Sequence, residues 1–214
     1  MIFLNRILII ALTTFWGYSG AVQAGAYEDM LQAIHMGDEK TISELLRRGM
    51  EVDTVNPKGD TLLMLAAREG KPGVVRAILA ARPKVYLRNP VGESALMLAT
   101  IMGHTEVVQL LLQAGAPVNQ SGWTPLIYAA AGNRADVARL LIARGADVNA
   151  PAENGTTALM MAAREGHLQM LLLLLEHGAD AKYVSPFGHS ALSLARDRDH
   201  PEIAAVLLKA GVQE

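Results

Sequence analysis

Apolar positions follow a helical period in two kinds of short segment that succeed each other along most of the chain. Residues 62–69 (LLMLAARE) represent the first kind, in which leucine and methionine stand beside small alanines. Residues 107–113 (VVQLLLQ) represent the second kind, which is apolar on most of its surface. Apolar residues three and four positions apart are typical of helices, and a helix that is apolar on most sides has to be packed between neighbours. The pattern therefore predicts pairs of short helices stacked side by side.

A phrase that opens with glycine divides these helix pairs into repeating units. It occurs as GDTLLMLAA, GESALMLAT, GWTPLIYAA, GTTALMMAA and GHSALSLAR, at spacings of 33, 30, 33 and 33 residues. Eleven residues after each opening glycine comes a glycine, Asn133 or Asp199, and each of these tolerates the left-handed conformation that ends a helix. The glycines are therefore predicted to punctuate helices and hairpins.

Each unit contains the signals that start and bury a helix. Hydroxyl residues that can cap the first helix stand at one register, namely Thr61, Ser94, Thr124, Thr157 and Ser190. Leucines expected in the core share another register, namely Leu63, Leu96, Leu126, Leu159 and Leu192. One unit cannot bury this apolar surface alone, so stability should be approximately a sum of terms between neighbouring units.

The period and the phrases together resemble the ankyrin-repeat family, whose repeat is about 33 residues long. The family's Thr-Pro-Leu-His phrase is best matched by residues 124–127, and its Gly-Ala-Asp-Val-Asn phrase is complete at residues 145–149. The resemblance covers essentially residues 26–214. It implies an all-α solenoid of six helix-turn-helix units with short β-hairpin loops, forming a single elongated domain over residues 25–214. The expected units are residues 26–58, 59–91, 92–121, 122–154, 155–187 and 188–214.

One departure from the family phrase concerns its fourth position, where the family has histidine. Here that position is occupied by Met64, Met97, Ile127, Met160 and Ser193. We expect packing to replace the hydrogen bonds of the missing histidine, and the helix pairs to be somewhat less rigid at their N-termini.

The first 24 residues differ from the rest of the chain. Arg6 precedes an uncharged, mostly apolar run over residues 7–16, and small residues follow up to Ala24. This is the order of regions in a secretory signal peptide. We predict cleavage after Ala24, or alternatively after Ala26, and location in the periplasm or outside the cell. An uncleaved anchor is the competing interpretation, but a spanning helix needs about 20 apolar residues, roughly twice the length of this run.

Composition and charge exclude several classes of function. The chain has 214 residues, with 19 Lys+Arg against 21 Asp+Glu and a formal charge of −2, so nothing favours a nucleic-acid partner. It has no cysteine, which excludes a disulfide scaffold, a thiol nucleophile and a zinc–cysteine site. Apolar residues make up 51% but aromatic residues only 5%, which suits closely stacked helices better than a β-sandwich.

No pattern of catalytic, metal-ligating or cofactor-binding residues is present in the sequence. His104, His167 and His200 share one register at the start of the second helix, where the simplest role is packing against the adjacent loop. Successive units separate such residues by about 10 Å, which is too far for a shared zinc. The methionines of the repeat register are expected in the core. We therefore predict no catalytic residues, no cofactor, no metal and no enzymatic activity.

Function should then depend on surface positions that the repeat leaves free. The resemblance places these at the hairpin tips and at the two residues before each mid-unit glycine, around a concave groove. The candidate partner-binding residues are an apolar centre, Val91, Ile101, Met102 and Trp123, and charged flanks, Arg68, Glu69, Arg164 and Glu165. An apolar centre with a polar rim is the anatomy of a protein interface. Alternatively, Trp123 fills the space left by its short hairpin, since the spacing there is 30 residues.

The sequence thus predicts a non-catalytic, monomeric protein-binding module of the bacterial envelope, without stable membrane insertion once the leader is removed. The partner would be a protein, and the role would be that of a scaffold, a protective partner of an envelope enzyme or an immunity protein. A secreted effector that acts on host proteins is the alternative. A ligand carrier or an enzyme is a more distant one.

Overall fold

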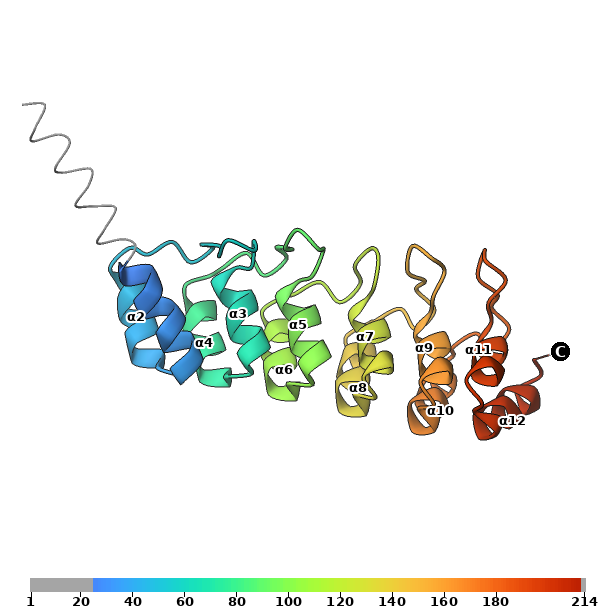
Figure 1. Cartoon of the computed structure of the whole chain (residues 1–214). Coiled ribbons are helices and arrows are strands. Elements are labelled where there is room, and N and C mark those ends of the chain that lie inside the picture. Colours follow the sequence, from blue (N-terminus) through green and yellow to red (C-terminus); the bar gives the residue numbers. More distant parts are fainter. Residues whose placement is uncertain (1–24, 213–214) are drawn as a thin grey trace, which may run out of the picture.

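The chain folds into a row of helix pairs with loops projecting on one side (Figure 1). The computed structural model describes residues 25–212; the predicted signal peptide at residues 1–24 lies outside the described residues. A helical segment over residues 25–36 comes first. The helices that follow are α2 (Glu39–Arg47), α3 (Leu62–Glu69), α4 (Pro72–Ala80), α5 (Ala95–Met102), α6 (Thr105–Gln113), α7 (Pro125–Ala131), α8 (Ala135–Ala143), α9 (Ala158–Arg164), α10 (Leu168–Glu176), α11 (Ala191–Asp197) and α12 (Pro201–Lys209).

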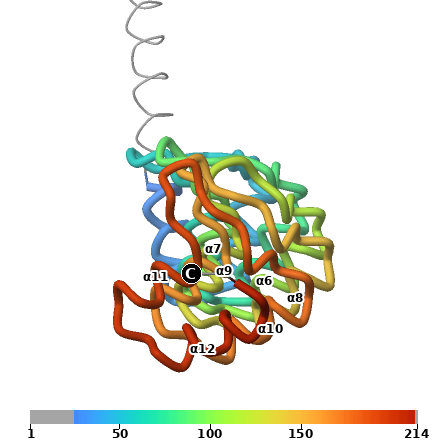
Figure 2. Tube along the Cα trace, turned by 90° about the vertical axis from the view of Figure 1, so that its right-hand side faces the viewer, coloured from blue at the N-terminus to red at the C-terminus, as the bar shows by residue number. Residues whose placement is uncertain are grey.

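The helices form two layers that run the length of the row. In one layer α3, α5, α7, α9 and α11 each contact the next, and in the other layer α2, α4, α6, α8, α10 and α12 do the same. Figure 2, turned by 90°, shows the units lying behind one another. Within residues 25–212 the β-structure is limited to three isolated bridges. The predicted all-α solenoid is therefore confirmed, whereas the exact limits of the six units stay a prediction.

The core is the interface between successive units, as predicted. The five register leucines are between 0% and 3% exposed, and so are the paired alanines of α3, α7 and α9. Met64, Met97 and Met160 are also buried, which confirms the methionines as core residues. Small alanines let neighbouring helices approach closely, and the longer side chains fill the spaces between layers. Leu172 on α10 is an exception, because 40% of it is exposed.

The first helix of each unit starts at the predicted cap. The hydroxyl of Thr61 accepts a hydrogen bond from the backbone N–H of Met64, and the four equivalent caps do the same. The expectation that only packing replaces the family histidine is wrong in three units. Met64 Sδ accepts the N–H of Thr61 at 3.4 Å, and Ser193 Oγ accepts that of Ser190 at 2.9 Å. The α9 cap is like that of α3, because a thioether sulfur is a weak acceptor that reaches the same amide.

Helices end in the left-handed residues that the sequence pattern predicts. Asn133 and Asp199, which stand where other units have glycine, have φ of 53° and 57°. Arg82 adopts φ of 56° after α4, although it lacks the freedom of glycine there. L-residues other than Gly, Asn and Asp are unfavourable in this region, so Arg82 is a local weakness of the row.

Candidate functional site

The loops that project from the row, here called fingers, join the second helix of one unit to the first helix of the next. They comprise residues 49–61, 82–94, 115–124, 145–157 and 178–190. The first, second and fifth fingers each close with an isolated antiparallel bridge, such as Arg88 with Ser94. The fourth finger has no bridge but keeps a closing hydrogen bond from the N–H of Ala152 to the carbonyl oxygen of Thr156 at 2.8 Å, whereas the third finger, three residues shorter, has neither in the described structure. The shortened spacing thus changes the form of the middle finger.

Polar side chains from both sides hold the short third finger in place. Arg88 of the second finger donates to the carbonyl oxygen of Ser121 at 3.1 Å and to its hydroxyl at 3.3 Å. The amide of Gln120 donates to the hydroxyl of Ser94, the cap of α5, at 3.1 Å. The third finger is also bonded to the fourth one, because Asn119 donates to the carbonyl oxygen of Gly145 and accepts the N–H of Asp147, both at 2.9 Å.

A cavity of about 430 Å³ remains beside the third finger, between the second and the fourth; we call it the central notch. It is lined by Arg88, Pro90, Val91, Gly92, Met97, Gly122, Trp123, Tyr128, Glu153 and Asn154. Volumes of this order suit a ligand group or an anchoring side chain. The notch lies where the third finger is three residues shorter than its neighbours.

Aromatic and aliphatic side chains form one wall of the central notch. Trp123 is half-buried, and its ring lies 5.3 Å from that of Tyr128, tilted by 44°. Val91, at the tip of the second finger, is 78% exposed. Burial raises the pKa of Tyr128, and the nearby Glu93 carboxylate raises it further, while Arg88 opposes this. Trp123 therefore packs partly on its own unit and still presents surface to the notch.

Ile101 and Met102 do not line the central notch. They are the last two residues of α5, whereas Met97 near its start does line the notch. An eight-residue helix is about 12 Å long, so the predicted apolar centre is divided between the two ends of α5. Ile101 is half-buried and Met102 is 48% exposed. A partner that contacts both groups has to lie along the whole helix.

Arg68 and Glu69, the predicted charged flank on α3, are engaged with neighbouring groups. Arg68 Nη1 lies 3.1 Å from Oδ2 of Asp60, a carboxylate that is only 2% exposed. Glu69 lies 3.5 Å from Nδ1 of the exposed His35. The role of Asp60 was not predicted from the sequence. This carboxylate gives Arg68 a structural partner within its own unit.

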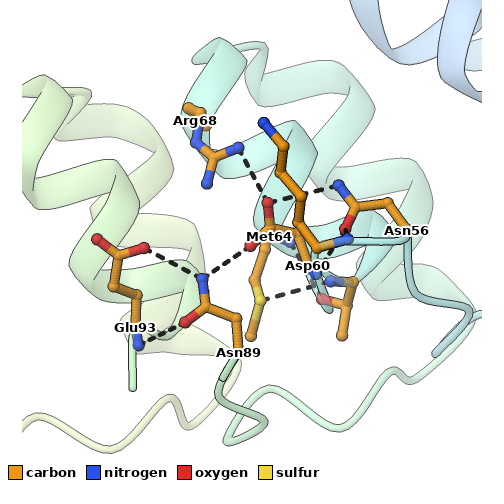
Figure 3. A network of polar contacts seen from close by, with 8 residues as sticks. Asn56, Asp60, Met64, Arg68, Asn89 and Glu93 are labelled. Carbon is orange, nitrogen blue, oxygen red and sulfur yellow. Dashed lines mark hydrogen bonds and ion pairs between the residues drawn. The ribbon is translucent and has the colours of Figure 1, made fainter. Parts of the chain in front are cut away.

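Asp60 stands at the centre of a polar network that joins the first two fingers (Figure 3). Its carboxylate accepts the amide of Asn89, from the second finger, at 2.8 Å. The same amide lies 3.1 Å from Glu93. Burial raises the pKa of Asp60, but the hydrogen bonds from Asn89 and Arg68 outweigh burial and lower it. A buried charge is tolerated here because it is paired and hydrogen-bonded.

Arg164 and Glu165 form the other predicted flank, at the end of α9. Their side chains are 2.9 Å apart in an ion pair with both groups partly exposed. Arg164 also lines a smaller cavity, of about 270 Å³, together with Phe187 of the fifth finger. The eight predicted residues belong to the fingers and to the ends of the first helices, and we call the surface formed by these elements the finger face. Their binding role stays a prediction.

The repeat-register histidines have the packing role that the sequence predicts. His104 Nε2 lies 3.0 Å from the carbonyl oxygen of Arg68 in the preceding unit. His167 and His200 make the equivalent contacts with Ala131 and Arg164, both at 3.1 Å. Each ring therefore links two units by satisfying a carbonyl at a helix end.

Of the ten residues that line the central notch, Val91 and Trp123 were predicted site residues, whereas Arg88, Tyr128 and Glu153 are among the eight that were not. Tyr128 follows Trp123 by five positions in the phrase GWTPLIYAA, and this aromatic pair was the available signal. Arg88 and Glu153 belong to neighbouring units, and only the folded row brings them to the same cavity.

A larger cavity, of about 740 Å³, lies at the N-terminal end of the row. It is lined by residues 26–27, by the end of α2 and by the first finger as far as Pro57. The buried hydroxyl of Tyr27 has no hydrogen-bond partner there among the described groups. Sequence reasoning gave no sign of this cavity.

Residues 25–212 contain neither a cluster of metal-ligating side chains nor a helix that could span a membrane. No three His, Asp or Glu side chains are grouped as metal ligands would be. No helix in this part of the chain combines the length and the apolarity needed to cross a bilayer.

Family models for ankyrin repeats match most of the chain. Residues 78–152 match the model "Ankyrin repeats (3 copies)", residues 141–195 match "Ankyrin repeats (many copies)", and residues 58–90 match "Ankyrin repeat". The chain therefore belongs to the ankyrin-repeat family. Ankyrin repeats are protein–protein interaction modules and are generally not catalytic. A comparison with curated proteins found no match.

Proposed function

We propose that this protein is a non-catalytic, monomeric module of the bacterial envelope that docks a protein partner on its finger face. The central notch carries the proposal, because it joins a half-buried Trp123 to the exposed Val91 in a cavity of about 430 Å³ beside the short third finger. Tryptophan is among the residues that most often carry binding energy at interfaces. Nucleic acid and membrane are not among the proposed partners, and no cofactor is required.

The non-catalytic part of the proposal is supported by the positions that the polar side chains occupy. His104, His167 and His200 are held at carbonyl oxygens between units. The hydroxyls of the five cap residues accept backbone amides. Groups that resemble acid–base candidates in the sequence therefore already have structural roles.

The location in the envelope rests on the sequence of residues 1–24, with its charged start, apolar run and small residues before Gly25. In the periplasm the protein would act as a scaffold, as the protective partner of an enzyme or as an immunity protein. A secreted effector that acts on host proteins remains the alternative proposal.

Partner capture from the native envelope fraction tests the finger face. Trp123→Ala and Val91→Asp should each lose the captured protein, because one removes the aromatic wall and the other charges the exposed tip. Ile101→Asp tests whether the partner also covers the end of α5. Val184→Asp on the fifth finger is the matched control, since Val184 is 55% exposed and lies outside the notch. Retention of every partner by Trp123→Ala and Val91→Asp contradicts the proposal.

The location is tested by fractionating cells that express the full chain with a C-terminal tag. Mass spectrometry of the purified protein should find Gly25 or Tyr27 at the N-terminus, according to the cleavage site. Recovery of the tagged protein in the cytoplasm with residues 1–24 intact contradicts export.

A further inference from the structure

The charges around the central notch are unequal once their contacts are counted. Glu153 of the fourth finger lines the cavity, and its carboxylate has no ion-pair partner within residues 25–212. Glu93 lies close enough to Tyr128 to raise the pKa of its hydroxyl, and it accepts only a neutral amide, that of Asn89. The carboxylate of Glu153, the acidic group that lines the notch, is therefore available to a cation.

The one guanidinium that lines the notch is already engaged with backbone oxygens. Arg88 Nε lies 2.5 Å from the carbonyl oxygen of Gly92, and Nη1 and Nη2 both contact Ser121. This arginine pins the second and third fingers together. Three of its five N–H donors are therefore occupied, and its charge still offsets one carboxylate.

The lining of the notch also includes two aromatic residues, Trp123 and Tyr128. Trp123 and Tyr128 lie 5.3 Å apart with a tilt of 44°, so their faces are not stacked flat on each other. Aromatic faces carry negative electrostatic potential and attract cations, tryptophan most strongly. Aromatic surface and carboxylate together are a combination that suits a basic side chain.

We infer that the central notch receives a basic side chain of the partner protein, with arginine preferred over lysine. This inference rests on the proposed function and names the chemistry of the segment that enters the finger face. A guanidinium is planar, so it can lie on Trp123 while its edge donates hydrogen bonds to Glu153. The apolar stem of the same side chain would pack against Val91 and Met97.

The arginines of the two predicted charged flanks are already paired with carboxylates of the same chain. Arg68 is paired with Asp60, and Arg164 is paired with Glu165. The acidic partners of these two arginines are therefore neutralised within the chain. Glu153 differs from them because it has no such partner among the described residues, so a partner's positive charge would be complementary at the notch.

Short capped peptides test the inference through the tryptophan itself. The full chain has two tryptophans, so Trp16→Phe leaves Trp123 as the only emitter. We would titrate Ac-Ala-Arg-Ala-NH₂ and its norleucine counterpart into this full-length protein and follow the emission of Trp123. The arginine peptide should produce a saturable change that weakens with added salt, and the norleucine peptide should produce little change.

Variants of the two exposed glutamates separate the notch from general acidity. Glu153→Gln should weaken binding of the arginine peptide by about fivefold, the upper range for an exposed ion pair. Glu165→Gln, which removes the same charge elsewhere on the finger face, should leave binding unchanged. Equal effects of the two variants would overturn the inference.

Two further outcomes also overturn the inference without touching the proposed function. Equal binding of the norleucine peptide would mean an apolar anchor, and no saturable change with either peptide would mean no side-chain site. In both cases partner capture can still depend on Trp123 and Val91, and that dependence is measured separately.

Discussion

Two junctions between neighbouring units differ in how their polar positions are used. Where the unit of α9 and α10 meets that of α7 and α8, His167 reaches the carbonyl oxygen of Ala131 at 3.1 Å from a partly buried position. Where the unit of α7 and α8 meets that of α5 and α6, Arg134 takes the place of histidine and makes an exposed contact of 3.4 Å with Ile101. We call the latter the central junction. Its helix-end contact is the weaker one.

The fingers show the same difference. In the regular junctions an Asn or Asp accepts the backbone N–H of the next finger, as Asn149 does for Asp180 at 2.7 Å. At the central junction the equivalent pair is Tyr86 and Pro117, and proline has no N–H to donate. The comparison teaches that the usual side-chain bond is missing between the second and third fingers, where Arg88 supplies a substitute.

We expect the apolar core to be packed equally well at the central junction and at a regular one. The two substitutions with the largest predicted effects test this expectation. Leu96→Ala at the central junction and Leu159→Ala in α9 should each lower the free energy of unfolding by about 3 kcal/mol, since both side chains are buried and leave a cavity. Denaturant unfolding measures both. A cost at Leu96 below half of that at Leu159 would show that the central junction is also loosely packed.

Asp60→Ala should lower the free energy of unfolding by about 2 kcal/mol at pH 7, because Asn89 and Arg68 lose a buried charged acceptor. The folded pKa of Asp60 is lowered below the unfolded value of about 3.9. Its contribution is therefore present above that pH and is lost as the pH falls through the folded pKa. The difference in free energy of unfolding between the unaltered protein and Asp60→Ala should therefore become smaller at acidic pH. The exposed Glu51→Ala serves as the control, and a difference independent of pH would count against a charged Asp60.

His104→Ala should lower the free energy of unfolding by about 1.5 kcal/mol, because a partly buried carbonyl at the end of α3 loses its partner. Arg134→Ala at the central junction should change it by less than about 0.5 kcal/mol, since its contact is exposed. The two variants are compared by thermal and denaturant unfolding. Equal losses would remove the distinction between the junctions.

Arg82→Gly should raise the free energy of unfolding by about 1 kcal/mol, because the left-handed backbone after α4 favours glycine. Gly115→Ala at the equivalent place after α6 should lower it by a similar amount. An added Cβ at Gly115 meets no atom within 4 Å, so its cost is conformational only. Denaturant unfolding of the two variants measures the cost of the left-handed backbone. A lower free energy of unfolding in Arg82→Gly would contradict the prediction.

Restoring the length of the third finger should have the smallest effect on stability and the clearest effect on the notch. Replacing residues 119–122 (NQSG) by a copy of residues 149–155 (NAPAENG) restores the 33-residue spacing. We expect the free energy of unfolding to change by less than about 1 kcal/mol, because surface loops tolerate insertions. In the Trp16→Phe background, quenching of Trp123 by acrylamide should fall as the longer finger covers it. Unchanged quenching would mean that the notch does not depend on finger length.

Local signals made much of the fold predictable. Thr157 and Leu159 occupy fixed offsets in the phrase, so hydroxyl capping and helical periodicity predict their positions without knowledge of distant contacts. The roles of His104 and its equivalents were also predictable, because one register repeated in several units favours packing. The acceptor role of Met64 was missed because a sulfur bond depends on the rotamer rather than on the residue type.

The candidate site was less predictable than the fold. Trp123 and Val91 were predicted from their positions in the phrase, and they do line one cavity. Ile101 was grouped with them because the repeat pattern does not show distance. In the structure Ile101 lies at the far end of α5 from the notch. The ion pair between Arg68 and the buried Asp60 could also be seen only in the structure, because the two residues are eight positions apart and pack across the start of a helix.

The sequence by itself determined the helix pairs, their caps, their core faces and the position of the short finger, because these depend on contacts within one unit or on the repeat period. Only the tertiary structure decided that Arg88, Trp123 and Glu153 surround one space and that Arg88 is bound to backbone oxygens there. These three residues come from three successive fingers. Their distances depend on how whole units stack, and stacking is set by the packed surfaces of all the helices together.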